Sequence, residues 1–192
     1  MAGTRRLPSA TGTIDPADPA VSNVLVLSSS LDAAPDPTPA PVRLLGADGR
    51  PLVYVALTRR DLTHLDDWLT AAGSDAPEVR LIDATPGDRA PRPDVPVTSV
   101  AAPDALTDLG VATGRALAAS APDPVCAFRS LTALRQYVDR RSAYRFLNAA
   151  VDRTAAESVL SCYAADPRAL SDRDLHAFAS LFDAVHDRRD QN

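Results

Sequence analysis

The residues best placed to do chemistry stand where a buried strand opens directly into a helix. The strand is Val125–Phe128, and Arg129 and Ser130 follow it as a polar break. Apolar residues then recur at helical spacing, which predicts a helix that begins at this break. Because α/β proteins place ligand sites at the carboxyl ends of their strands, Arg129 is a candidate site residue. A guanidinium there could hold an anion through two parallel N–H donors.

A structural role for Arg129 is the alternative. Its guanidinium would then pair with an aspartate that the fold brings close, such as Asp32 or Asp83. From the sequence alone we favour this ion pair over an anion site. A second group of cations, Arg140, Arg141 and Arg145, follows Asp139 and is interpreted as a solvated helix face.

A serine-rich turn ends the first predicted strand. It reads Ser28-Ser29-Ser30-Leu31-Asp32. No G-x-S-x-G elbow surrounds these serines, and no histidine has the context of a catalytic triad, so we expect no nucleophile. The histidines and cysteines show no metal-ligand spacing, which predicts that the chain binds neither a metal nor a cofactor; they are His64, His176, His186, Cys126 and Cys162.

Both cysteines lie in predicted buried strands. Cys126 belongs to the run VCAF and Cys162 to the run VLSCY. A free cysteine in such a position packs as a small hydrophobe. We therefore interpret the two thiols as core residues rather than as a redox pair.

The charges are unusual in kind. All 20 basic residues are Arg, and 23 of the 25 acidic residues are Asp. The net charge of −5 argues against a dedicated nucleic-acid surface, which needs clustered cations. An Asp-rich chain without Lys is typical of extreme halophiles, where molar salt shortens the Debye length to ~3 Å; a high-GC bacterial genome is the alternative source.

Hydropathy predicts no membrane segment and a cytoplasmic location. No apolar run approaches the ~18 residues of a membrane span. The two arginines near the N-terminus precede no apolar segment, so a secretory signal is not expected. Residues 1–20 and 189–192 are predicted to be tails that flank a single domain over residues 21–188.

Strands and helices alternate along this domain. Apolar runs of buried-strand type predict an α/β, three-layer fold with a mostly parallel central sheet flanked by helices. The predicted strands are 24–27, 52–57, 79–83, 97–100, 125–128, 158–163 and 184–186. Helices are predicted over 62–73 with Thr58 or Asp61 as the cap, from Pro103 to near Ser120, from Ser130 through Val151, and after Ser171 across Leu175–Phe182.

This order, together with the segment V-C-x-F-x-S-L-T-A-L-x-Q-Y-V-D, resembles the RecA/KaiC-like ATPase core. More narrowly, the chain resembles short "HTR-like" RecA-superfamily proteins of halophilic archaea. The resemblance covers about residues 21–188, and SLTALRQYVD followed by AYRFLNAA is its most specific part. It implies a twisted, mostly parallel sheet flanked by helices.

The residues that ATP chemistry needs are replaced. The phosphate loop (Walker A) of active members uses glycines, Lys and Ser/Thr, whereas the matching turn here is Ser28–Ala34, without Gly or Lys. The acid that orients Mg²⁺ (Walker B) is replaced by Arg129, followed by Ser130. The resemblance therefore implies a degenerate ATPase that is not an enzyme.

Two functions are consistent with these residues. The first is a non-catalytic RecA/KaiC-like domain that acts in regulation or signalling by association with a protein partner or with itself. The alternative is a nucleotide- or anion-binding sensor, or an atypical ATPase, that uses backbone amides near Ser28–Asp32 and the guanidinium of Arg129.

Overall fold

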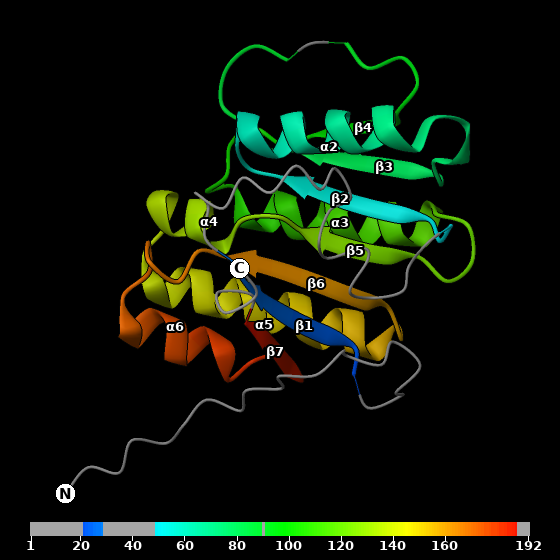
Figure 1. Cartoon of the computed structure of the whole chain (residues 1–192). Coiled ribbons are helices and arrows are strands. Elements are labelled where there is room, and N and C mark those ends of the chain that lie inside the picture. Colours follow the sequence, from blue (N-terminus) through cyan, green and yellow to red (C-terminus); the bar gives the residue numbers. More distant parts are fainter. Residues whose placement is uncertain (1–20, 29–48, 90, 188–192) are drawn as a thin grey trace, which may run out of the picture.

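The computed structural model describes residues 21–28, 49–89 and 91–187 of the chain. The predicted tails, residues 1–20 and 189–192, lie outside these ranges. Seven strands form one sheet in the order β4-β3-β2-β5-β6-β1-β7, and every neighbouring pair is parallel (Figure 1). The predicted α/β class and central sheet are confirmed, and the sheet is parallel throughout.

The strands coincide with the apolar runs of the sequence. They are β1 (Asn23–Leu27), β2 (Leu52–Ala56), β3 (Val79–Asp83), β4 (Val97–Ser99), β5 (Val125–Phe128), β6 (Leu160–Ala165) and β7 (Ala184–Asp187). A strand covered on both faces by helices is apolar at every position, and β1, β2, β5 and β6 are buried throughout. Strand β6 begins two residues later than predicted, because Ser158 has a positive φ of 56° in the turn before it.

Five α-helices and one 3₁₀ segment connect the described strands. They are α2 (Arg59–Ala72), η1 (Gly73–Asp75), α3 (Leu106–Ala119), α4 (Leu131–Tyr137), α5 (Arg140–Ala156) and α6 (Asp172–Ala179). None of these described helices has the length and hydropathy to cross a membrane.

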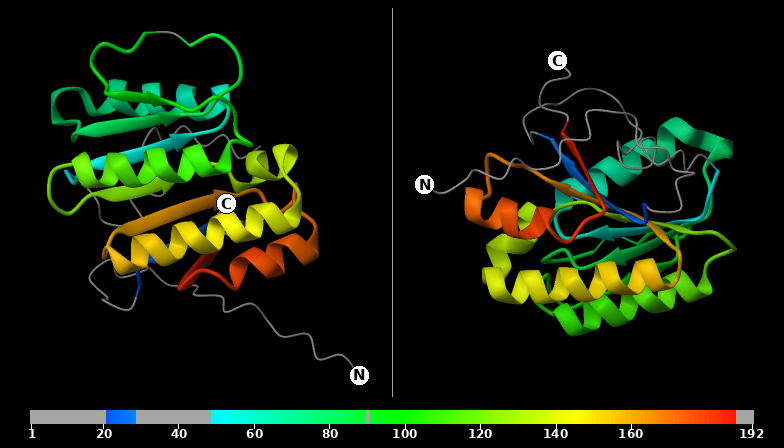
Figure 2. Two further views of the ribbon diagram at one scale, coloured as in Figure 1. Left: turned by 180° about the vertical axis from the view of Figure 1, so that it is seen from behind. Right: turned by 90° about the horizontal axis from the view of Figure 1, so that it is seen from below.

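Handedness decides which face of the sheet each helix covers. The β2–α2–β3 connection runs toward β4, whereas those through α3, α5 and α6 run in the opposite direction across the sheet. Because such crossovers are right-handed, α2 covers one face and α3–α6 cover the other (Figure 2).

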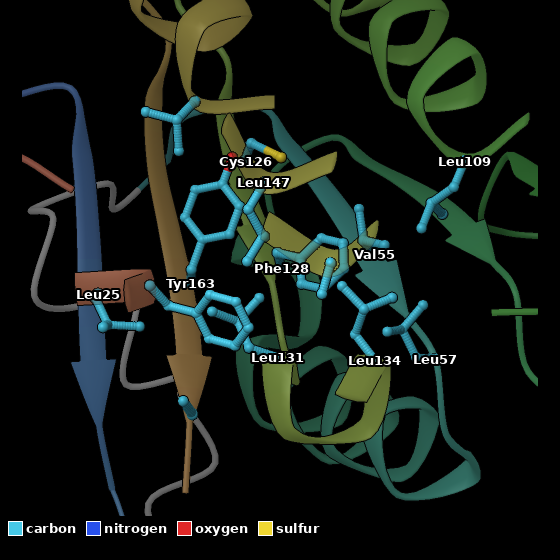
Figure 3. Close-up of a cluster of buried hydrophobic side chains, with 14 of the residues drawn as sticks. Leu25, Val55, Leu57, Leu109, Cys126, Phe128, Leu131, Leu134, Leu147 and Tyr163 are labelled. Carbon is cyan, nitrogen blue, oxygen red and sulfur yellow. The ribbon is translucent and has the colours of Figure 1, made fainter. Parts of the chain in front are cut away.

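Two apolar clusters result, one on each face. The larger lies under α3–α6 and contains Phe128 and Tyr163, whose rings stack with their centroids 5.8 Å apart (Figure 3). The smaller lies under α2 around Tyr54 and Trp68. Alternate residues of each strand enter opposite clusters.

The cysteines follow the same alternation. Cys126 lies in the larger cluster and Cys162 in the smaller one, so the sheet separates the two thiols. Both are free and buried, which confirms their interpretation as core residues. Burial raises the pKa of the Cys126 thiol to about 12, so it stays protonated at neutral pH.

Three sequence predictions about the helices are wrong in detail. The stretch after Ser130 forms two helices instead of one, because the side chain of Asp139 accepts from the backbone N–H of Ser142 at 3.0 Å and begins α5 there. Helix α3 begins at Leu106 rather than at Pro103. A turn precedes it, in which Ala105 N donates to Ala102 O.

The last helix is shorter than predicted. It ends at Ala179, and the chain then turns directly into β7, so Leu181 and Phe182 pack after the helix. His186 is buried in β7 with 5% exposure.

Candidate functional site

The candidate site lies at the carboxyl ends of β2 and β5. These neighbouring strands leave the sheet in opposite directions, β2 toward β3 and β5 toward β6 (Figure 1). Such a divergence at the carboxyl edge of a parallel sheet is the place where α/β proteins bind ligands. The residue that follows β5 at this point is Arg129, and its backbone N–H donates to the carbonyl of Val55 with 3.4 Å between N and O.

Arg129 is half-buried as a residue. Its positive charge acts on Tyr54, Asp61 and His64, all of which belong to the α2 face. Within residues 21–28, 49–89 and 91–187, no side-chain hydrogen bond or ion pair to Arg129 is formed. A cation therefore stands at this edge of the sheet, and its side chain has no hydrogen bond or ion pair from the described residues.

The ion pair with Asp83 that the sequence suggested is wrong. Asp83 ends β3, and its carboxylate pairs with the guanidinium of Arg89 at 3.4 Å. The same carboxylate accepts from the backbone N–H of Thr85 at 2.9 Å and from its hydroxyl at 2.7 Å. Strand β2 lies between β3 and β5, which keeps Asp83 away from Arg129. Asp32, the other suggested partner, lies outside the described residues.

The carboxylate of Asp61 is occupied by the start of α2. It accepts from the backbone N–H groups of Leu57 at 3.0 Å and Thr58 at 2.9 Å, while the Thr58 hydroxyl accepts from Asp61 N at 3.2 Å. This reciprocal arrangement is a capping box. Burial raises the pKa of Asp61, and the hydrogen bonds from Leu57 and Thr58 and the charge of Arg129 oppose that rise.

His64 stands one turn further along α2 and is half-buried. Burial lowers its pKa, and the cations of Arg129 and Arg60 lower it further, against a weaker opposing effect of Asp67. The Nε of Arg60 donates to Nε2 of His64 at 3.4 Å. The imidazole is therefore held neutral beside a cation.

The remaining predicted site residues have structural roles or lie outside the described chain. Ser28 directly follows β1, is half-buried, and donates its N–H to the carbonyl of Ala165 at 3.1 Å. Ser130 begins α4, because its hydroxyl accepts from the backbone N–H of Ala133 at 3.0 Å. Ser29, Ser30 and Asp32 of the predicted phosphate-loop position lie outside the described residues.

The chemistry that this arrangement supports is the binding of an anion. It combines a cation whose side-chain donors have no partner among the described residues, a neutral imidazole and a carboxylate already bound to backbone N–H groups. Searched over the described part of the chain, no group of three or more His, Cys, Asp or Glu side chains is placed to hold a metal ion.

Sequence reasoning found Arg129 but not its neighbours. The spacing of Thr58 and Asp61 predicts a helix cap, and His64 shows no metal-ligand spacing that would mark it as a site residue. Their proximity to Arg129 depends on β2 lying beside β5, although β3, β4 and α3 separate these strands in the chain.

Comparison with known proteins adds a family without an assigned activity. Residues 21–187 match the model of a family described as "Family of unknown function (DUF7504)". No curated protein matches the chain. The matched range contains every strand from β1 to β7, so the similarity extends over the whole described sheet.

Proposed function

The chain belongs to the DUF7504 family of unknown function, and we propose that it is a non-catalytic binding domain that recognises an anionic group beside Arg129. Its role would be regulatory or signalling. The observation that supports this function best is the half-buried Arg129 at the carboxyl ends of β2 and β5, whose guanidinium has no ion pair or side-chain hydrogen bond within the described residues.

A cation that is unpaired within residues 21–28, 49–89 and 91–187 favours an anionic ligand on energetic grounds. Removing a charge from water is unfavourable unless a partner replaces the lost solvation. The planar guanidinium matches phosphate and carboxylate oxygens, to which it donates two parallel hydrogen bonds. Phosphate groups of a nucleotide or of pyrophosphate are therefore the ligands that this site would bind.

Hydrolysis of such a ligand is not part of the proposal. Phosphoryl transfer depends on a metal ion held by a carboxylate. The carboxylate of Asp61 is engaged in the cap of α2, and that of Asp83, two strands away from Arg129, pairs with Arg89. A cation at position 129 would repel Mg²⁺. The resemblance to RecA/KaiC-like ATPases stays a prediction. If it holds, this site would bind a phosphate-containing ligand without hydrolysing it.

Isothermal titration with pyrophosphate, ADP and ATP tests this function. We expect saturable binding that does not require Mg²⁺ and that weakens at least tenfold in Arg129→Gln. Arg141→Gln is the matched control, because Arg141 is an exposed arginine on α5. Absence of binding by the folded wild-type protein, or equal binding by Arg129→Gln, would refute the proposal.

Self-association is the second candidate, and strand β4 favours it. This strand lies at one end of the described sheet, and all three of its residues are exposed, with Val97 at 40%. An open edge offers backbone groups to a second copy of the chain. Light scattering after gel filtration should show a dimer that Val97→Lys disrupts; a monomer at every concentration would exclude this interface.

A further inference from the structure

The face of the sheet opposite to α2 contains a cavity of about 260 Å³ between α3 and α5. The two helices lie side by side over the sheet (Figure 2, left). Cys126 and Phe128 of β5 and Tyr163 of β6 form the floor (Figure 3). We propose that this cavity binds an uncharged small aromatic molecule, a function that goes beyond the anion site at Arg129 and does not depend on it.

Aromatic rings dominate the inner wall. Phe128 stacks on Tyr163 with centroids 5.8 Å apart, and Phe146 of α5 is tilted against Phe128 with centroids 5.9 Å apart. All three rings border the cavity. Aromatic pairs are favoured in offset-stacked and edge-to-face arrangements, so a further ring in this space would find faces and edges to contact.

Three polar side chains of the lining, those of Thr113, Arg153 and Thr154, have partners within the described residues. The hydroxyl of Thr154 donates to Asn23 Oδ1 at 2.7 Å, and that of Thr113 donates to Leu109 O at 2.8 Å. Arg153, at the rim, pairs with Glu157 at 3.1 Å. A charged ligand would have to displace one of these partners, which is why the proposed ligand is uncharged.

The volume limits the size of the ligand. An apolar cavity of about 150 Å³ in an engineered protein stays dry and binds benzene. The space between α3 and α5 is larger, at about 260 Å³. It is large enough for one or two fused rings and too small for a drug-sized molecule, for which pockets begin at about 300 Å³.

Gly110 of α3 keeps part of this space open. At Gly114, a Cβ would meet Nη1 of Arg153, the far end of a flexible side chain that would have to shift. At Gly110, a Cβ would lie 3.9 Å from Cε2 of Phe146, an ordinary contact, so an alanine would fit. Glycine within a helix is destabilising relative to alanine. Neither packing nor helix stability explains Gly110, whereas an occupied cavity would.

Indole is a suitable probe, since it is uncharged and has two fused rings. Added to the full chain, it should bind saturably, raise the melting temperature, and shift the NMR signals of Phe128, Phe146 and Tyr163. Gly110→Leu, which fills the cavity, should weaken binding at least tenfold. Ala118→Leu is the matched control, because Ala118 is exposed on the same helix, and its affinity should equal that of the wild type.

The following results would overturn the proposal. They are no saturable binding of indole by the folded wild-type protein, unchanged affinity in Gly110→Leu, and indole-3-acetate binding as tightly as indole. If Gly110→Leu fails to fold, Gly110→Ala serves in its place, with a smaller loss of affinity expected and unchanged affinity counting against the site. Shifts confined to residues away from the cavity would also contradict it.

Discussion

The backbone N–H of Arg129 donates to the carbonyl of Val55, and this hydrogen bond of 3.4 Å continues the pairing of β5 with β2 beyond Phe128. Past this point the two strands separate: β2 is followed by α2, and β5 is followed by α4 (Figure 1). The position therefore places the cation beside the start of α2. The predictions below concern the cation, its neighbours on α2 and the charge of the whole chain.

Replacing Arg129 by Gln should change the free energy of unfolding by less than about 1 kcal/mol, as for a residue without specific contacts. The reason is that no ion pair or side-chain hydrogen bond is lost within the described residues. Urea unfolding measures this difference. Arg135→Gln is the comparison, because Arg135 bonds Asp174 at 3.2 Å and the carbonyl of Val138, and it should lose about 1–2 kcal/mol. A loss above about 2 kcal/mol for Arg129→Gln would instead indicate a buried, paired charge.

The pKa of His64 should rise in Arg129→Gln. In the wild-type protein, burial lowers this pKa below its ordinary value of 6.5, and the Arg129 and Arg60 cations add to the effect. Since the folded-state pKa lies below the unfolded one, the stability that neutral His64 provides is present above pH 6.5 and is lost as the pH falls through the folded pKa.

NMR titration of the imidazole signals measures this pKa directly. The variant should also lose less stability than the wild type on acidification through that range. Arg141→Gln, which changes an exposed arginine of α5, should leave the His64 titration unchanged. An identical His64 titration in Arg129→Gln would place the guanidinium away from α2.

Removal of the Asp61 carboxylate should destabilise the protein by about 1–3 kcal/mol, because a helix cap is lost and buried N–H groups lose their acceptor. The affected donors are the backbone N–H groups of Leu57 and Thr58. Thermal and urea unfolding of Asp61→Ala give the magnitude. Asp61→Asn keeps an acceptor oxygen and should lose less, and Asp67→Ala, at an exposed position of α2, should be nearly neutral. Equal stability of Asp61→Ala and Asp67→Ala would contradict the capping role.

Dilute buffer should lower the melting temperature relative to molar KCl. The chain carries 23 Asp among its 25 acidic residues and a net charge of −5, and repulsion between carboxylates is screened only when the Debye length is short. Melting curves followed by circular dichroism over a series of KCl concentrations test this expectation. Identical melting temperatures at all KCl concentrations would contradict the halophilic interpretation of the composition.

The sequence by itself determined the elements of this fold. Buried strands of a parallel sheet are continuous apolar runs, so β1, β2, β3 and β5 were predicted to within one residue. Helix caps depend on side chains within three residues of the helix start, which made Thr58, Ser130 and Ser171 recognisable. The break between α4 and α5 was missed, because the apolar stripe continues across it while the cap at Asp139 interrupts the backbone.

Only the tertiary structure decided which elements are neighbours. Strand pairing is made of backbone hydrogen bonds that any two apolar strands can form, so the run of residues does not encode that β2 lies beside β5. This adjacency brings Arg129 to Asp61 and His64 and separates it from Asp83. The cavity between α3 and α5 depends on the same long-range order, because its floor joins β5 to β6. Sites of this kind form where strands that are distant in the sequence pair and bring side chains together. Local sequence patterns do not predict such pairing.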